Sequence, residues 1–321
     1  MNQELFKLAY EKIKRAKNIL LVTHDRPDGD GVSSLCALAE LMEMENKKYT
    51  LFCQDEPPAQ FNYLSHWEKI IAQKSRLDFY QYDLIIALDC GSLNRTNLVN
   101  EIFNKNDNQI NIEFDHHPKI DDYADLEIRL PEASSTAEVL YRFFKTNQIK
   151  INKNIATCIL TGMLTDTNNF LYPSTSDTTI QIASEMLVYG ARLPIILESA
   201  YRNKSIQAMK LWGRALSNLK INPRYNFAYS VLTYDDMIQC PVTDEELEGI
   251  AGFLSNLGNV SALLFLREEK NGIIRGSLRT AQPQIDVSQL AQILGGGGHK
   301  KASGFVICGH LEKTDNGFQV I

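Results

Sequence analysis

Residues 18–31 read NILLVTHDRPDGDG, in which a short apolar run leads directly into histidine and aspartate residues. An apolar run of this length, bounded by polar residues, is typical of a buried strand in a parallel sheet. The segment after the run contains one proline and two glycines, which predict a tight loop. Ligands of parallel sheets bind outside the carboxyl ends of the strands. We therefore expect His24, Asp28 and Asp30 to lie on a loop at a ligand site.

The same pattern recurs twice further along the chain. The run Leu84–Leu88 precedes an aspartate, and the run Ile110–Phe114 precedes an Asp-His-His triplet. Another aspartate follows the helical pattern of residues 155–164. Because the carboxyl ends of parallel strands lie at one edge of a sheet, we expect these clusters to converge. The residues expected at this site are His24, Asp28, Asp30, Asp89, Asp115, His116, His117 and Asp166.

This set of side chains indicates a metal site. So many carboxylates in one place repel one another unless cations are bound. Imidazole together with carboxylate suits Mn, Fe, Co or Zn. Two such metals about 4 Å apart can hold both an attacking water and phosphoryl oxygens, and Asp89 is the natural candidate for a bridging carboxylate. Each motif alone is more often a turn or a helix cap, so the hypothesis of a two-metal hydrolase rests on their joint recurrence.

The alternation of strand and helix patterns predicts a doubly wound, mostly parallel α/β sheet over residues 1–189. Residues 190–204 are expected to form a linker, and residues 205–321 a smaller α/β domain with a mixed sheet whose adjacent strands pair antiparallel. The predicted strands are Ile19–Thr23, Tyr49–Cys53, Leu84–Leu88, Ile110–Phe114, Phe227–Thr233, Val260–Arg267, Gly272–Arg279 and Gly304–Cys308. The predicted helices are Ser33–Met44, Ala137–Lys145, Ile155–Leu164, Thr178–Tyr189, Ile206–Leu219, Asp244–Leu254 and Val287–Leu294.

Composition limits the class of protein. The 321 residues, 44% of them hydrophobic, are enough for about two domains with real cores. No run of 18 apolar residues predicts a membrane span, and the N-terminus lacks the apolar centre of a secretory signal. The six scattered cysteines are expected to be reduced thiols of a cytoplasmic protein. The net charge of −6 argues against a protein that coats duplex nucleic acid.

A second candidate site lies near the C-terminus, where four glycines at positions 295–298 precede His299, Lys300 and Lys301. Glycines can adopt positive φ and let a phosphate approach the backbone amides, which then form an anion-binding nest. The basic residues would add hydrogen bonds and positive charge in an otherwise acidic protein. Arg279, on a predicted strand, would be a second phosphate anchor because its guanidinium is a planar fork.

These motifs resemble those of the DHH phosphoesterase superfamily, and residues 295–305 resemble its companion DHHA1 domain. The compact two-domain form is most similar to the bacterial oligoribonuclease and pAp phosphatase (nanoRNase) family. The resemblance implies two Mn²⁺ ions, with other divalent metals left open. One ion would be held by His24, Asp28 and Asp89, and the other by Asp30, Asp89, His116 and Asp166. His117 would contact the scissile phosphate, Asp115 would orient a neighbouring histidine, and the substrate would be bound by Arg279, Gly296, Gly297, Gly298, His299 and Ser303.

The sequence departs from the family pattern in two places. The first motif continues as Gly31-Val32-Ser33-Ser34, where the family usually has Ala and then Gly-Ser. Leu171 stands where the family often has arginine, which puts one substrate contact in doubt. The stretch 134–137 opens a predicted helix as an N-cap, and the family places it near the site.

The expected function is metal-dependent hydrolysis of very short oligoribonucleotides to mononucleotides, together with dephosphorylation of pAp. Cleavage of cyclic di-AMP or pApA by the same chemistry stays open. An inorganic pyrophosphatase is disfavoured because the Ser-Arg-Lys-Lys-Gln motif expected of that branch is not found. A catalytically silent nucleotide-binding protein is a further alternative, although every expected ligand is present. The expected partners are a short oligoribonucleotide or nucleotide, with no duplex nucleic acid and no membrane, and a homodimer is left open.

Overall fold

The computed structural model describes residues 2–202, 204–247, 249–314 and 317–321. The chain divides into two compact units, residues 1–202 and 203–321, and each is described here by itself. Within the described residues no single helix is long and apolar enough to span a membrane. The bent pair Asp177–Val188 and Leu193–Ser199 meets the length and composition criteria only when its two helices are taken together.

The first unit is built on a six-stranded sheet in the order β3-β2-β1-β4-β5-β6, and all neighbouring strands pair parallel. The order reverses between β1 and β4, as it does in a doubly wound sheet. The predicted fold class is therefore confirmed. The strands are β1 (Asn18–Thr23), β2 (Lys48–Phe52), β3 (Ile70–Ile71), β4 (Leu84–Leu88), β5 (Ile110–Asp115) and β6 (Leu126–Arg129).

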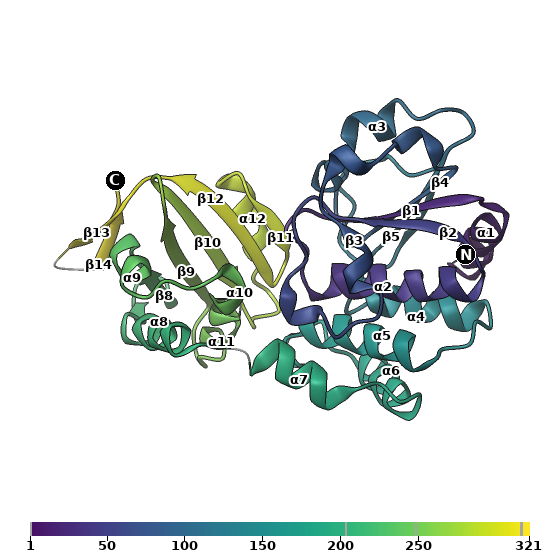
Figure 1. The fold of residues 1–321 in the computed structure, drawn as a ribbon. Helices are drawn as coiled ribbons and strands as arrows, with labels where there is room; N and C mark the ends of the chain where they lie inside the picture. The colour runs from purple at the N-terminus through teal and green to yellow at the C-terminus, as the bar shows by residue number, and fades with distance from the viewer. Residues whose placement is uncertain (1, 203, 248, 315–316) are drawn as a thin grey trace. The chain divides into compact units, whose positions relative to one another are not determined.

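Both faces of this sheet are covered. Ile19 and Leu21 of β1 belong to the larger apolar core, whereas Leu20 and Val22 belong to a smaller core on the opposite face. This alternation explains why the central strands are continuous apolar runs. Figure 1 shows α2, α4, α5 and α6 on one side of the sheet and α3 on the other. The helices are α1 (Asn2–Arg15), α2 (Gly29–Met44), α3 (Val99–Phe103), α4 (Thr136–Thr146), α5 (Lys153–Asp166), α6 (Asp177–Val188) and α7 (Leu193–Tyr201), with short 3-10 turns η1 (Ala59–Phe61), η2 (Trp67–Lys69), η3 (Lys74–Arg76), η4 (Phe79–Gln81) and η5 (Leu93–Thr96).

The second unit contains a mixed six-stranded sheet in the order β11-β12-β10-β9-β8-β7 and a separate β13–β14 hairpin. Strands β8 and β9 pair parallel, whereas the other neighbours in the sheet pair antiparallel. The strands are β7 (Lys220–Asn222), β8 (Phe227–Leu232), β9 (Ala262–Glu269), β10 (Ile273–Arg279), β11 (Gly297–His299), β12 (Ala302–Cys308), β13 (Leu311–Thr314) and β14 (Gly317–Val320). The helices are α8 (Ile206–Ser217), α9 (Tyr234–Gln239), α10 (Asp244–Leu247), α11 (Ile250–Leu254) and α12 (Val287–Ile293).

The structure differs from the sequence predictions in several places. The expectation that adjacent strands of the second sheet all pair antiparallel is wrong for β8 and β9, because α9, α10 and α11 intervene and return the chain in the same direction. The helix predicted over 244–254 is divided between α10 and α11, and Gly249 between them has a φ of +91°. Most of the predicted 190–204 linker forms α7, whose Ile196 is buried in the first core.

The close approach of α2 and α5 depends on Gly162. A Cβ atom at this position would lie 2.4 Å from Asp30 Oδ1 and 2.6 Å from Ala137 Cβ. Both of these atoms belong to buried residues, so neither has room to move aside. The absence of a side chain at position 162 therefore lets α5 pack directly behind the carboxylate of Asp30.

Gly162→Ala should destabilise the first unit by about 2 kcal/mol, because the added methyl group overpacks the junction of α2, α4 and α5. Urea denaturation followed by circular dichroism would measure the loss. The control is Gly213→Ala in α8, where a Cβ meets nothing within 4 Å. That change should be neutral or stabilising by up to about 1 kcal/mol. Equal stability of the Gly162→Ala variant and the natural protein would contradict the packing argument.

Candidate metal centre

Three adjacent strands deliver the site residues to one edge of the first sheet. His24 follows β1, Asp89 follows β4, and Asp115 is the last residue of β5. These strands lie side by side, and the reversal of strand order falls between β1 and β4. The site therefore lies at the topological switch point, where doubly wound sheets bind ligands. Asp89 has a φ of +61°, a backbone conformation that is uncommon outside glycine and that recurs at functional sites.

His24 and Asp28 lie in the connection after β1, as the sequence predicts, whereas Asp30 lies in a helix. α2 begins at Gly29, and Asp28 is its N-cap, with Oδ1 accepting hydrogen bonds from the amides of Asp30 at 3.0 Å and Gly31 at 3.1 Å. Asp30 lies in the first turn, where the helix dipole favours a negative charge. The loop prediction fails for Asp30 because Gly29 and Gly31 belong to the helix, where they allow close packing against Thr165 and Thr23.

One cluster consists of His24, Asp28 and Asp89, whose potential ligand atoms all lie within 4.8 Å of one another. His24 Nε2 lies 3.6 Å from Asp28 Oδ1 and 3.7 Å from Asp89 Oδ2. These distances are longer than a hydrogen bond. They are the separations expected of two ligand atoms that each lie about 2.1 Å from one metal ion, which are roughly 3.0 to 4.2 Å apart. The cluster can therefore hold a metal.

A second cluster consists of Asp30, Asp89 and His116. His116 Nε2 lies 3.6 Å from Asp89 Oδ1, 4.0 Å from Asp30 Oδ2 and 3.6 Å from Asp166 Oδ2. Asp89 thus faces His24 with one carboxylate oxygen and His116 with the other. This is the geometry of a carboxylate that bridges two metal positions.

The two histidines show that a cation fits between these groups. His24 Nδ1 lies 2.7 Å from the carbonyl oxygen of Asp25, and His116 Nδ1 lies 3.3 Å from that of Ala133. A carbonyl only accepts, so in the neutral ring the proton is on Nδ1 and the lone pair of Nε2 faces the carboxylates. This arrangement is repulsive unless a cation lies between the lone pair and the carboxylates. Histidines that bind metals have this same orientation, with the second nitrogen bonded to a backbone carbonyl.

The titration behaviour of the acids also fits a cation site. Burial and the nearby Asp166 carboxylate raise the pKa of Asp30 to about 8. Burial and the Asp30 carboxylate raise the pKa of Asp89 well above its usual value. Both shifts arise because negative charge is concentrated away from water. A divalent cation removes this penalty and stabilises the ionised carboxylates.

The N-terminus of α4 holds both of these acids in place. The backbone amides of Thr136 and Ala137 donate to Asp30 Oδ2 at 2.6 Å and Oδ1 at 3.0 Å. The hydroxyl of Thr136 donates to Asp89 Oδ1 at 2.9 Å. Ser135 is the N-cap of α4, as the sequence predicts for this stretch. The first turn of α4 therefore orients the carboxylates of Asp30 and Asp89 in addition to starting the helix.

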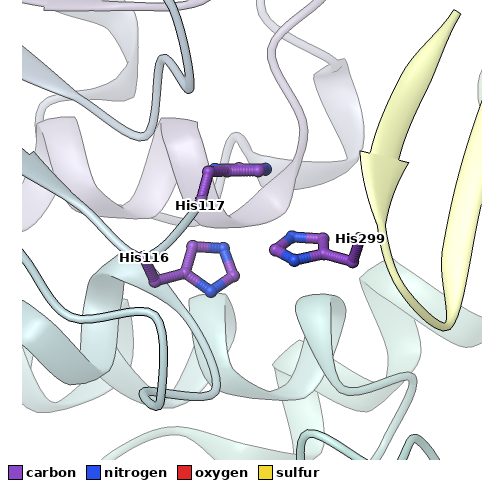
Figure 2. Close-up of side chains that lie close together, drawn as sticks. All are labelled: His116, His117 and His299. Atoms are coloured by element: carbon purple, nitrogen blue, oxygen red, sulfur yellow. The ribbon is translucent and has the colours of Figure 1, made fainter. Parts of the chain in front are cut away.

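His117 lies beside His116 at the end of β5, with their ring centroids 4.6 Å apart (Figure 2). Asp115 Oδ1 accepts from the His117 amide at 2.7 Å and contacts His117 Nδ1 at 2.9 Å, while its Oδ2 accepts from the Gly91 amide at 2.6 Å. Burial raises the pKa of Asp115, but the hydrogen bonds with His117 and the charges of His117 and Arg129 together outweigh burial and hold that pKa well below its usual value. Asp115 therefore stays ionised and fixes the His117 ring.

Two buried residues behind His117 are functional candidates that the sequence does not reveal. Arg129 Nη1 donates to the His117 carbonyl at 2.7 Å, and its Nη2 pairs with Glu113 Oε1 at 2.7 Å. Arg129 lies opposite Asp115 in the register between β5 and β6. In the sequence, the local sign of this arrangement is that Glu113 and Asp115 lie on one face of β5. It points to Arg129 only when the pairing of β6 with β5 is known.

In the second unit, part of the predicted glycine nest has a structural role. The amide of Gly296 donates to the carbonyl of Ala291 at 2.8 Å at the end of α12, so it is not directed at an anion. A Cβ at Gly296 would lie 2.1 Å from the carbonyl oxygen of Gly304. Gly297, Gly298 and His299 form β11, which pairs with β12 in a tight hairpin.

Two other predicted substrate residues also have internal partners. The Ser303 hydroxyl is buried and donates to the carbonyl of Val287 at 2.9 Å. Arg279 Nη1 donates to the carbonyl of Leu278 at 2.9 Å and contacts that of Ser303 at 3.4 Å. Arg279 is half-buried, so part of its guanidinium remains accessible. The Ser303 hydroxyl and the Gly296 amide are therefore used inside the unit, whereas part of the Arg279 guanidinium stays accessible.

The fold and the acid–histidine clusters define an α/β protein whose doubly wound sheet has, at one edge, side chains that could hold a metal ion. The DHH family, N-terminal domain, matches residues 18–163, and the DHHA1 domain matches residues 225–321. The chain therefore contains a DHH N-terminal domain followed by a DHHA1 domain.

Similar proteins cover nearly the whole chain. It is 28% identical to the bifunctional oligoribonuclease and PAP phosphatase NrnA of Bacillus subtilis, over 89% of this chain and 88% of that one. It is 29% identical to a probable protein of the same name from Streptococcus mutans, over 93% and 92%. The crystal structure of an exopolyphosphatase-related protein from Bacteroides fragilis is also similar, with a TM-score of 0.86 and 28% identity over 94% and 91%.

Asp89→Asn should weaken the binding of divalent metal by at least about 100-fold, because the amide lacks the negative charge that both clusters share. Titration calorimetry with MnCl₂ and metal analysis of the purified protein would measure the loss. The matched control is Asp83→Asn at the opposite end of β4, where Asp83 accepts hydrogen bonds from the amides of Lys17 and Asn18. That variant should bind metal normally. Undiminished metal binding by the Asp89→Asn variant would contradict the shared-ligand geometry.

Proposed function

We propose that this protein is a metal-dependent phosphohydrolase that degrades very short oligoribonucleotides to mononucleotides and also dephosphorylates pAp. The observation that carries the proposal is the shared position of Asp89, which faces His24 and His116 with separate oxygens. A site of this kind suits the hydrolysis of phosphate esters. The names of the relatives from Bacillus subtilis and Streptococcus mutans, which cover nearly the whole chain, support the substrate class.

The metals proposed for this site are two Mn²⁺ ions. The first would be held by His24, Asp28 and Asp89. The mixed imidazole and carboxylate donors favour a transition metal over Mg²⁺ or Ca²⁺. When bound, such ions lower the pKa of a coordinated water and neutralise phosphoryl oxygens. The ligands proposed for the second ion are Asp30, Asp89, His116 and Asp166.

His117 is the residue proposed to contact the scissile phosphate. Its Nδ1 lies 2.9 Å from Asp115 Oδ1, and this contact fixes the orientation of the ring. With a proton on Nε2, the ring would donate to a phosphoryl oxygen and stabilise the negative charge that develops there. Arg129, through the His117 carbonyl, and Asp115, through the ring, would hold this donor in position before the substrate arrives.

The second unit is proposed to bind the far end of the substrate. Arg279, Gly297, Gly298 and His299 are the candidates for this role. The guanidinium of Arg279 suits a phosphate, and His299 can add a hydrogen bond. We also propose that the protein acts in the cytoplasm, because all six cysteines are free thiols.

With Mn²⁺ present, the protein should hydrolyse pApA, a five-nucleotide RNA and pAp, and spare a long single strand. Phosphate and nucleotide release from this panel, with cyclic di-AMP included, would measure the preference. Faster turnover of the cyclic compound would replace the proposed substrate by a cyclic dinucleotide. No hydrolysis of any compound by metal-loaded protein would refute the enzymatic proposal.

His299→Ala should raise the KM for pApA about tenfold and leave the bound metal unchanged, because the residue is assigned to the substrate and not to the metal. Steady-state kinetics and metal analysis would measure the two effects. The matched control is His310→Ala in the same unit, where His310 Nδ1 contacts Glu268 at 2.9 Å. That variant should keep a normal KM. Loss of metal from the His299→Ala variant would show that the division of roles is wrong.

A further inference from the structure

Arg95 is a basic residue at the edge of the metal centre. It lies in η5, and its carbonyl accepts a hydrogen bond from the amide of Asp25 at 2.7 Å. This bond ties the segment after β4 to the segment after β1, so the Arg95 backbone is fixed next to the first cluster. The side chain is 39% exposed, which leaves the guanidinium accessible to a ligand.

The guanidinium contacts one site histidine and lies near the same glycine as a second. Its Nη2 is 2.7 Å from His24 Nδ1. A Cβ built on Gly91 would lie 3.6 Å from Arg95 Nη1 and 3.5 Å from His117 Cγ. Arg95 and His117 therefore flank the same glycine, whose lack of a side chain leaves the space between them open. Gly91 has a φ of +68°, which also restricts this position to glycine.

The contact between Arg95 and His24 cannot persist as a hydrogen bond when His24 binds a metal. His24 Nδ1 is also 2.7 Å from the Asp25 carbonyl, and one ring nitrogen cannot both accept from arginine and donate to a carbonyl. With Nε2 on a metal, Nδ1 keeps its proton and donates to the carbonyl. The N–H groups of Arg95 then face another N–H group and require a different acceptor.

The other contacts of the guanidinium are weak. Nε is 3.5 Å from Asp25 Oδ1, in a pair whose side chains are 39% and 41% exposed, and Nη1 is 3.4 Å from the Cys90 carbonyl. Exposed pairs of this kind stabilise a protein little. Arg129, in contrast, has only 5% of its side chain exposed and pairs with buried Glu113, so it cannot leave to bind a ligand.

We propose that Arg95 is a substrate-binding residue of the metal centre, whose guanidinium binds non-bridging oxygens of the phosphate that lies beside His117. The inference rests on the proposed function for the identity of the ester, but the ligand chemistry it requires is only a phosphate monoester or diester. A planar guanidinium can bind two phosphate oxygens at once. Arg95 would thereby complete a site whose other proposed groups for phosphate are the metals and His117.

Binding of AMP and of inorganic phosphate to Mn²⁺-loaded protein tests this assignment without turnover. Calorimetry should show Kd values about 10- to 100-fold higher for Arg95→Ala, as expected for the loss of charge-assisted hydrogen bonds. Arg95→Lys should give intermediate Kd values, because lysine keeps the positive charge but lacks the planar guanidinium that binds two phosphate oxygens at once. The control is Arg15→Ala at the end of α1, an exposed arginine that precedes the amino end of β1. Metal content and thermal stability should stay unchanged in all three variants.

A chemical rescue separates a binding role from a structural one. Guanidinium at low millimolar concentration should restore part of the pAp hydrolysis lost in Arg95→Ala and should not affect Arg15→Ala. Loss of metal from Arg95→Ala, or unaltered phosphate binding, would overturn the inference while the proposed function stands. A third outcome is that the natural protein hydrolyses none of the substrates, while the Arg95→Ala variant binds phosphate more weakly than the natural protein does. In that case the proposed function fails and the inference stands.

Discussion

The shared carboxylate of Asp89 is the constraint on which the rest of the first unit depends. It is 2% exposed and faces an imidazole on each side, so its charge has no stabilisation from water. The surrounding elements each contribute to this one position. β4 ends there with positive φ, the Thr136 hydroxyl donates to one oxygen, and β1 and β5 bring His24 and His116. Burying this much negative charge raises the free energy of the folded protein, and the packed core of strands and helices holds the carboxylates in place.

Two helix N-termini supply part of the positive charge. Asp28 caps α2, and the first amides of α4 hold both oxygens of Asp30. These dipoles fix the direction of the carboxylates, but burial still keeps the pKa of Asp30 near 8. The helix ends therefore orient the acids without neutralising them. The uncompensated negative charge that remains would favour the binding of a cation.

Glycine has different uses in the two units. Gly162 and Gly91 leave room near the metal centre, one for the packing of α5 and the other for the space between Arg95 and His117. Gly296 and Gly298 instead allow two backbones to approach in the β11–β12 hairpin, where a Cβ would meet carbonyl oxygens at 2.1 and 2.8 Å. A run of glycines in the sequence therefore does not by itself identify a phosphate-binding site.

The amino-acid sequence by itself determined the strands that carry His24, Asp89 and Asp115, because each is an apolar run followed at once by its site residue. Those signals are local, and strand ends of one parallel sheet must meet at one edge. Only the tertiary structure decided that Arg129 lies behind His117 and Arg95 beside it. β6 is too short to be recognised from its pattern, and Arg129 meets Asp115 only through strand register. Arg95 reaches His24 across 71 residues, a contact that no local pattern of residues encodes.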